Sequence, residues 1–147
     1  MYNVQITQLP GNTDLPLPKK MSVGSSGFDL CAAVEESVIV DPGKIILIPT
    51  GLAVGMPPNL EAQVRSRSGL ASKNGICVFN SPGTIDSDYR GEVSVIIYNA
   101  SSNRFQVKRG DRIAQLVFQE LPLVHFQIVQ ELNETARGTD GFGSTGF

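Results

Sequence analysis

The sequence predicts an all-β sandwich or barrel with at most one short helix. Short apolar runs rich in β-branched residues recur along the chain, Gly, Pro, Asn and Asp separate them, and one stretch alone has the features of a helix. At 147 residues, of which 41% are hydrophobic and 18% charged, the chain is long enough for one domain with a buried core.

The short apolar runs are predicted as strands, because several alternate apolar and polar side chains with the period of two that a half-buried strand shows. In chain order they are residues 4–6, 37–40, 45–48, 52–54, 61–64, 76–79, 93–98, 105–107, 113–118 and 124–129. Residues typical of turns lie between them, at 41–43, 57–59, 74–75, 81–83 and 109–111.

The helix and the C-terminal end complete the predicted organisation. Residues 68–74 are predicted as one or two helical turns, with Ser68 as N-cap and Gly75 as the C-terminal stop. Residues 1–132 are expected to form one β-domain. Residues 133–147 are rich in Gly and polar residues and have no periodic apolar positions, so we expect a flexible arm that is mobile until a ligand orders it.

Charge and cysteine usage exclude several classes of protein. The formal net charge is −2, so no broad basic surface is available for a nucleic-acid backbone. No stretch approaches the roughly 18 apolar residues of a membrane span. Cys31 and Cys77 lie in apolar contexts typical of core packing in a reducing compartment, with a disulfide as the less favoured alternative. They make no zinc motif with the single His125, which is predicted to be a strand side chain. We expect a cytoplasmic protein.

The C-terminal arm contains the first group of residues suited to a ligand. Its glycines let backbone N–H groups approach anionic oxygens, Ser144 and Thr145 add hydroxyl donors, and the Arg137 guanidinium matches the geometry of a phosphate. Phe142 offers a face on which a base can stack, worth roughly 1–3 kcal/mol. The spacing is not that of a Walker loop, and a glycine-rich tail taken by itself is more often an ordinary flexible terminus.

The second group, residues 80–91, places Asp86 and Asp88 between predicted strands. One of these carboxylates is suited to be a general base. Spacing alone does not choose between them, and it also fits an Asp- and Ser-rich β-turn closed by Gly91.

The third group lies at the predicted start of the helix. If Ser68 opens the helix, the free N–H groups of its first turn and the neighbouring Arg67 form an anion site. The alternative is an ordinary N-cap beside a solvated arginine.

Together and in this order, these groups and two further strings resemble the five motifs of the trimeric dUTPase family. The strings are residues 25–32 (SSGFDLCA), 67–71 (RSGLA), 83–92 (GTIDSDYRGE), 110–118 (GDRIAQLVF) and 137–146 (RGTDGFGSTG). Each string is short, but five in sequence in a chain of matching length are specific.

The resemblance implies a jelly-roll-like β fold and a homotrimer in which each active site lies between subunits, with the arm of another chain closing over it. It also implies Mg²⁺-dependent hydrolysis of dUTP to dUMP and pyrophosphate, by attack of water on the α-phosphorus. Such a reaction supplies the precursor of dTMP and keeps uracil out of DNA.

The resemblance further implies a role for each matched residue. Asp86 is the base that activates water, Tyr89 lies under the deoxyribose, and Asp29 supports Mg²⁺ through water. The residues implied to read or stack on uracil are Asn80, the main chain at Gly83, Thr84 and Ile85, and Phe142. Those implied to bind the phosphates are Arg67, Ser68, Gly69, Gln115, Arg137, Gly143, Ser144 and Thr145.

Departures from the family pattern are small, and two other functions remain open. Phe28 stands where Tyr is common, Ser66 where Pro is common, and Asp140 places an anion beside a triphosphate. The alternatives are a dCTP deaminase-like enzyme of the same fold and a nucleotide-binding regulatory trimer. Ammonia released from dCTP would indicate the first, and a protein partner recruited only with bound nucleotide the second.

Overall fold

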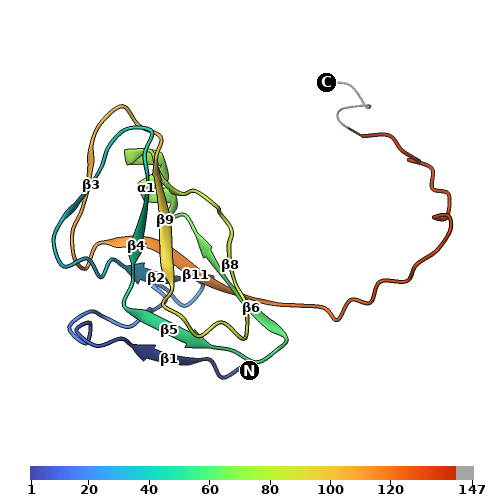
Figure 1. The fold of residues 1–147 in the computed structure, drawn as a ribbon, viewed down its shortest axis with the longest axis horizontal. Helices are drawn as coiled ribbons and strands as arrows, with labels where there is room; N and C mark the ends of the chain where they lie inside the picture. Colours follow the sequence, from blue (N-terminus) through green and yellow to red (C-terminus); the bar gives the residue numbers. More distant parts are fainter. Residues whose placement is uncertain (142–147) are drawn as a thin grey trace.

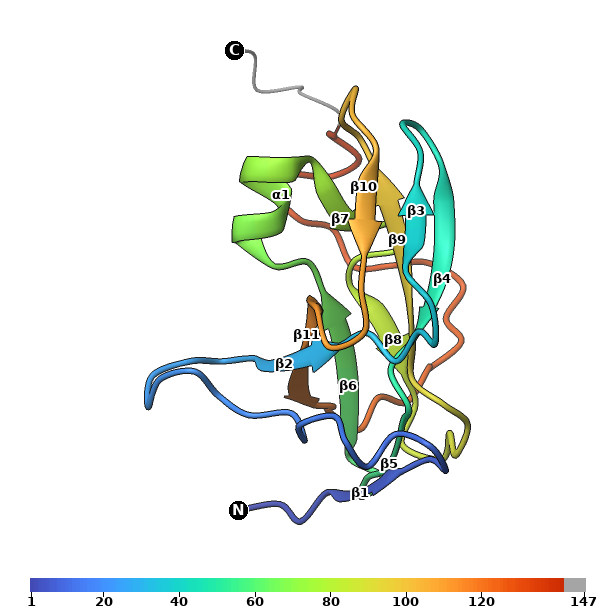
Figure 2. The same ribbon diagram turned by 90° about the vertical axis from the view of Figure 1, so that its left-hand side faces the viewer.

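The computed structural model describes residues 1–141 and confirms the all-β class with one short helix in that range (Figures 1 and 2). The strands are β1 Gln5–Gln8, β2 Phe28–Cys31, β3 Val38–Val40, β4 Ile45–Pro49, β5 Leu52–Gly55, β6 Leu60–Arg65, β7 Ile76–Val78, β8 Gly83–Ile85, β9 Ser94–Asn99, β10 Phe105–Val107 and β11 Arg112–Glu120. Helix α1, Ser68–Asn74, connects β6 to β7.

The strands form a jelly-roll-like sandwich of antiparallel sheets. One sheet has the strand order β2-β11-β6-β8 and another the order β4-β9-β7. The pairs β1-β5 and β3-β10 lie at opposite ends of the sandwich (Figure 2). Over residues 1–141 the strands form separate sheets and not a closed barrel, so the sandwich is the correct one of the two predicted architectures.

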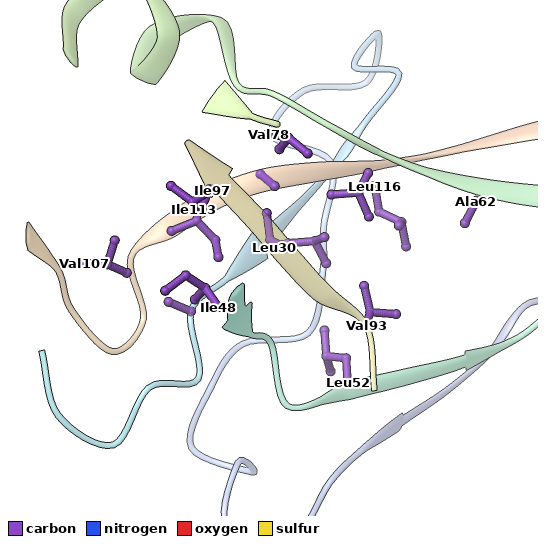
Figure 3. Packing of buried hydrophobic residues seen from close by; sticks show 14 of the residues in the cluster. Leu30, Ile48, Leu52, Ala62, Val78, Val93, Ile97, Val107, Ile113 and Leu116 are labelled. Atoms are coloured by element: carbon purple, nitrogen blue, oxygen red, sulfur yellow. The ribbon is translucent and has the colours of Figure 1, made fainter. Parts of the chain in front are cut away.

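The core between the sheets follows from the alternation of side chains along each strand. In β9, Val95, Ile97 and Asn99 are buried, whereas the side chains between them are partly exposed. Leu30 of β2 and Leu116 of β11 point into the same space from the facing sheet (Figure 3). Full burial of an aliphatic side chain of this size contributes about 1.5–3 kcal/mol, so this cluster fixes the two sheets on which the site is built.

One fully buried polar side chain, Asn99, has every hydrogen-bonding group occupied. Its Nδ2 donates to the carbonyl oxygens of Val40 and Asn103, both at 2.8 Å. Its Oδ1 accepts from the N–H of Ser101 at 2.9 Å and from the Ser101 hydroxyl at 2.8 Å. The end of β9 is thereby tied to β3 and to the loop before β10, and no buried polar group is left without a partner there.

The helix differs from the prediction at its first residue and agrees at its last. Its N-cap is Arg67, without a side-chain cap, so Ser68 is the first helical residue and the predicted Ser68 cap is wrong. The N–H of Ala71 donates to the Arg67 carbonyl at 3.0 Å, which sets the helix start one residue earlier. Gly75 ends the helix in the left-handed region at φ 65°, as predicted, and only glycine adopts this conformation without cost.

Two strands were not predicted and one predicted strand is absent. Strands β2 and β8 are short, and their local sequence does not predict a strand. Each is a strand because of its pairing, β2 with β11 and β8 with β6. Residues 124–129 were predicted as a strand but form none, because no strand of residues 1–141 lies beside them. His125 is accordingly exposed and is not a strand side chain.

The segment after β11 leaves the body of the molecule as an extended chain (Figure 1). Residues 121–140 are exposed throughout, including large apolar side chains such as Phe126 at 91% and Ile128 at 98%. An apolar segment with this degree of exposure is not stabilised by the chain that carries it.

Candidate functional site

One hollow, which we call the hairpin hollow, is built around β8 and has a volume of about 350 Å³. Its lining residues are Leu47, Val64, Asn80, Gly83, Thr84, Ile85, Asp86, Tyr89, Glu92, Ser94 and Ile96. The floor is apolar, because Leu47 of β4 and Ile96 of β9 are direct cross-strand partners whose side chains face away from the core. The rim carries the polar residues of the predicted second group.

Strand β8 is the edge strand of its sheet. It pairs with β6 through Ala62↔Ile85, Gln63↔Thr84 and Val64↔Gly83, and no strand lies on its other side within the described residues. The backbone N–H and C=O groups on that other side are therefore free to hydrogen-bond a ligand.

Gly83 lets the amide of Asn80 approach the start of this edge. A Cβ added at Gly83 would lie 3.0 Å from Asn80 Nδ2 and 3.3 Å from Oδ1. Both contacts are tighter than ordinary packing, so any side chain at this position would push the amide away.

Asp86 follows β8 directly and opens a tight turn. The N–H of Tyr89 donates to the Asp86 carbonyl at 3.1 Å, and Arg90 Nη1 donates to the carbonyls of Ser87 at 2.7 Å and Tyr89 at 2.8 Å. Asp86 lines the hairpin hollow, whereas Asp88 is absent from its lining. The fold thus distinguishes two carboxylates that spacing alone could not.

A second hollow, which we call the arginine hollow, has a volume of about 500 Å³. It is lined by Met21, Ser25, Ser26, Gly27, Asp29, Arg67, Ser68, Gly69, Arg112 and Gln115. Antiparallel pairing of β2 with β11 places Asp29 directly opposite Gln115, and pairing of β11 with β6 places Arg65 opposite Gln115 on the other side. The start of α1 follows β6, which brings Arg67 and Ser68 to the same edge.

Two arginines share one carboxylate in the arginine hollow. Asp29 Oδ1 lies 3.3 Å from Arg67 Nε, and Arg112 Nη1 donates to Asp29 Oδ2 at 3.0 Å. Arg67 Nη1 also donates to the Arg112 carbonyl at 2.8 Å. With two guanidinium groups and one carboxylate in its lining, the hollow has an excess of positive charge, which favours an anionic ligand.

The half-buried Asp29 also affects a neighbouring thiol. Burial raises the pKa of Cys31, and the negative charge of Asp29 raises it further. A raised pKa keeps the Cys31 thiol in its protonated, less reactive form at neutral pH. Both Cys31 and Cys77 are free, so the disulfide alternative is not realised.

Gln115 is held by its own hydrogen bond and by an adjacent glycine. Its Nε2 donates to the Ser66 carbonyl at 3.0 Å. A Cβ at Gly27 would lie 2.1 Å from Gln115 Oε1, so no other residue fits at position 27 with Gln115 in place. Gly27, like Arg112, lies in a predicted motif but was not itself predicted as a site residue.

The predicted site residues of the described chain fall into two groups, each of which lines a different hollow. The hairpin hollow contains Asn80, Gly83, Thr84, Ile85, Asp86 and Tyr89, and the arginine hollow contains Asp29, Arg67, Ser68, Gly69 and Gln115. The two linings share no residue. The fold therefore distributes the predicted site residues of residues 1–141 over two separate hollows, apart from Arg137.

Arg137 lies apart from both groups, in the exposed C-terminal segment. Its Nε donates to the Asp140 carbonyl at 2.8 Å, within a turn in which the N–H of Gly138 donates to the Thr135 carbonyl at 3.0 Å. The remaining predicted arm residues, Phe142, Gly143, Ser144 and Thr145, lie outside the residues that the structure describes.

Comparison with known proteins gives one consistent family. The dUTPase family model matches residues 13–146. The deoxyuridine 5'-triphosphate nucleotidohydrolase of Neorickettsia sennetsu is 49% identical over 144 residues, covering 98% of this chain and 97% of the relative. That of Wolbachia pipientis subsp. Culex pipiens is 50% identical over 145 residues, covering 97% and 95%.

Solved structures agree with the sequence relatives. A mutant dUTPase of Staphylococcus bacteriophage 80alpha with dUpNHpp superimposes with a TM-score of 0.87 at 25% identity, covering 99% of both chains. A second mutant of the same phage enzyme gives a TM-score of 0.85 at 26% identity, covering 97% of this chain and 98% of that one.

Proposed function

This chain belongs to the dUTPase family and hydrolyses dUTP to dUMP and pyrophosphate, and we propose that its two hollows divide the nucleotide between them. The hairpin hollow takes the base and sugar, and the arginine hollow takes the phosphates. The observation that supports this proposal is that the two hollows are separate and differ in chemistry. The hairpin hollow is apolar and lined by an edge strand, whereas the arginine hollow is positively charged.

In the hairpin hollow, the free edge of β8 reads uracil together with the Asn80 amide. Uracil offers O4 as an acceptor and N3–H as a donor, whereas cytosine reverses both, so cytosine would leave buried backbone groups unpaired. The backbone wall at this edge also excludes the 5-methyl group of thymine. Tyr89 lies under the deoxyribose and leaves no room for a 2′-hydroxyl.

Asp86 is the general base. In this role it orients a water molecule toward the α-phosphorus and takes its proton. Its position directly after the edge strand β8 and in the lining of the hairpin hollow supports the proposal. The two bonds between Arg90 and the turn carbonyls hold the backbone that carries Asp86.

In the arginine hollow, Arg67, Ser68, Gly69 and Gln115 bind the phosphates. The first N–H groups of α1 have no partner inside the helix, and Ser68 and Gly69 line this hollow together with Arg67. Phosphate oxygens compete with Asp29 for Arg67 Nε, which makes Asp29 Oδ1 available once the nucleotide is bound.

We propose Mg²⁺ as the cofactor, with Asp29 supporting it through water. Asp29 is the only carboxylate in the lining of the arginine hollow, and residues 1–141 contain no cluster of three or more His, Cys, Asp or Glu side chains arranged for a metal. This donor set fits Mg²⁺, which keeps several of its waters and is held mainly by substrate phosphates. When bound, Mg²⁺ offsets the charge that develops on the pyrophosphate leaving group.

We propose a homotrimer in which each site is assembled from different subunits. The separation of the two hollows supports this arrangement, since Asp86 and Arg67 line different hollows of the same chain. The exposed alternation of apolar and polar side chains in residues 124–129 also supports it, because such a segment becomes a stable strand once a neighbouring chain covers it.

The C-terminal arm, residues 133–147, completes the site of another subunit. We propose that Arg137, Gly143, Ser144 and Thr145 bind the β- and γ-phosphates and that Phe142 stacks on uracil. Arg137 forms no ion pair within the described chain, so its charge is available for a phosphate. The N–H of Asp140 donates to the Arg137 carbonyl inside the arm, so it does not donate to the nucleotide.

Among residues 1–141 no helix has the length and hydropathy needed to cross a membrane. We propose a cytoplasmic location. The two free thiols are compatible with the reducing conditions there.

The experiment that tests this function is pyrophosphate release from dUTP, dCTP, dTTP and UTP, with and without EDTA. We expect turnover of dUTP alone and its loss when EDTA removes the metal. Ammonia release from dCTP would indicate the deaminase instead, and no turnover of any nucleotide would indicate a binding module.

A further inference from the structure

The ring of Tyr89 lies directly on the backbone of Gly91. A Cβ added at Gly91 would be 2.3 Å from Tyr89 Oη, 2.5 Å from Cζ and 3.0 Å from Cε2. Gly91 has no positive φ, so its backbone conformation does not call for glycine. What requires glycine at position 91 is the ring that covers it.

Hydrogen bonds of the Tyr89 hydroxyl and of the Tyr89 backbone N–H also hold the ring in place. The Tyr89 hydroxyl donates to the Glu92 carbonyl at 3.2 Å, and the Tyr89 N–H donates to the Asp86 carbonyl at 3.1 Å. Glu92 is itself fixed to the body of the protein, because its Oε1 accepts the N–H of Gly51 at 2.7 Å. Tyr89 therefore has one defined position on the rim of the hairpin hollow, and Gly91 forms the surface beneath it.

We propose that Gly91 is a specificity-determining positioning residue that sets the depth of the Tyr89 ring and thereby the discrimination between deoxyribo- and ribonucleoside triphosphates. This inference rests on the proposed placement of Tyr89 under the sugar. Ordinary contact with a Cβ begins near 3.4 Å, so a methyl group at Gly91 displaces the ring atoms now at 2.3–2.5 Å by about 1 Å. Displacements of this size in a positioning group change rates by up to about a hundredfold.

The test is the Gly91→Ala variant, assayed for kcat and KM with dUTP and with UTP. We expect the ratio of kcat/KM for dUTP to that for UTP to fall by about tenfold or more, as found when a close steric fit is lost. The loss should lie mainly in KM for dUTP, because Asp86 is untouched. If this ratio for Gly91→Ala stays within about twofold of the ratio for the parent protein, the inference is wrong, because loss of a close steric fit should lower the ratio about tenfold.

Gly24→Ala is the matched control. Gly24 is exposed, has no positive φ and has no heavy atom within 4 Å of an added Cβ, so this substitution should leave both kinetic constants unchanged. Thermal unfolding of both variants shows whether either change affects the fold.

The double variant with Tyr89→Ala separates positioning from a general structural effect. Without the ring, a methyl group at Gly91 has nothing to displace, so Gly91→Ala added to Tyr89→Ala should not change the selectivity further. A further loss in that background would contradict the inference. If Tyr89→Ala alone keeps full selectivity against UTP, the proposed sugar gate is wrong; if Tyr89→Ala loses selectivity and Gly91→Ala does not, only the role of Gly91 is wrong.

Discussion

The division of the site between two hollows predicts that two inactive variants restore activity to each other in one assembly. Asp86→Asn removes the base from the hairpin hollow and leaves the arginine hollow intact. Arg67→Ala removes a guanidinium from the arginine hollow and leaves the hairpin intact. Because the two linings share no residue, each substitution damages only one half of a composite site.

The expected recovery follows from the geometry of the assembly. Suppose that a site takes its hairpin from one subunit and its arginine hollow from another, and that equal amounts of the two variants assemble at random. The hairpin is then intact in about one half of the sites, and so, independently, is the arginine hollow. About one quarter of the sites in the mixture then contain both intact halves, so about one quarter of the parent rate should return. If one chain supplied both halves, no site would be restored.

The assay is pyrophosphate release from saturating dUTP after the two variants, carrying different affinity tags, are unfolded and refolded together. Isolation through both tags in succession confirms that mixed assemblies are present. The matched control pairs Arg67→Ala with Gln115→Ala, two lesions in the same hollow, and should recover nothing. A doubly purified mixture of Asp86→Asn and Arg67→Ala with no more activity than its separate components would refute the divided site.

Three further predictions concern the base, the arm and the core. Asp86→Asn alone should still bind dUTP in calorimetry but lose turnover by about 10²–10⁴-fold, and a near-normal kcat would contradict its role as base. Truncation after Glu134 should leave a folded trimer by light scattering with severely reduced kcat/KM for dUTP, whereas an unchanged value would show that the arm is not used. Asn99→Leu leaves buried carbonyls and an N–H without partners and should lower the free energy of unfolding in urea, at fixed protein concentration, by about 1–3 kcal/mol. Asn103→Ala, which keeps the backbone acceptor, should change that free energy by less than about 0.5 kcal/mol.

The regular part of the fold was predictable because local sequence determines it. Strand β9 was predicted at 93–98 from alternation and lies at Ser94–Asn99, and Gly75 was predicted as the helix stop from the conformation that glycine favours. Strand β8 was missed because Gly83 after Pro82 has the sequence of a turn. It is a strand only because it pairs with β6, whose partner residues lie nineteen or more positions away in the sequence.

The site was predictable in its residue types but not in its arrangement. Motif resemblance, and not spacing, selected Asp86 over Asp88, and the lining of the hairpin hollow now gives a geometric reason for that choice. The roles of Arg112 and Gly27 depend on contacts with Asp29 and Gln115, which are distant in sequence. A pattern along one strand carries no information about which side chain from another strand will lie against it.

The failed strand prediction and the divided site have a common physical explanation. The alternation Val124-His125-Phe126-Gln127-Ile128 is the pattern of a strand with one covered face. Phe126 and Ile128 are nevertheless more than nine-tenths exposed, and no strand of residues 1–141 lies beside them. A sequence pattern of this kind is stabilising only where something covers its apolar side. We propose that the arginine hollow is incomplete in the same sense, because its lining contains Arg67 and Gln115 but neither Asp86 nor the edge of β8. In this proposal a second copy of the chain supplies what each feature lacks, so one assembly both covers the apolar segment and completes the polar site.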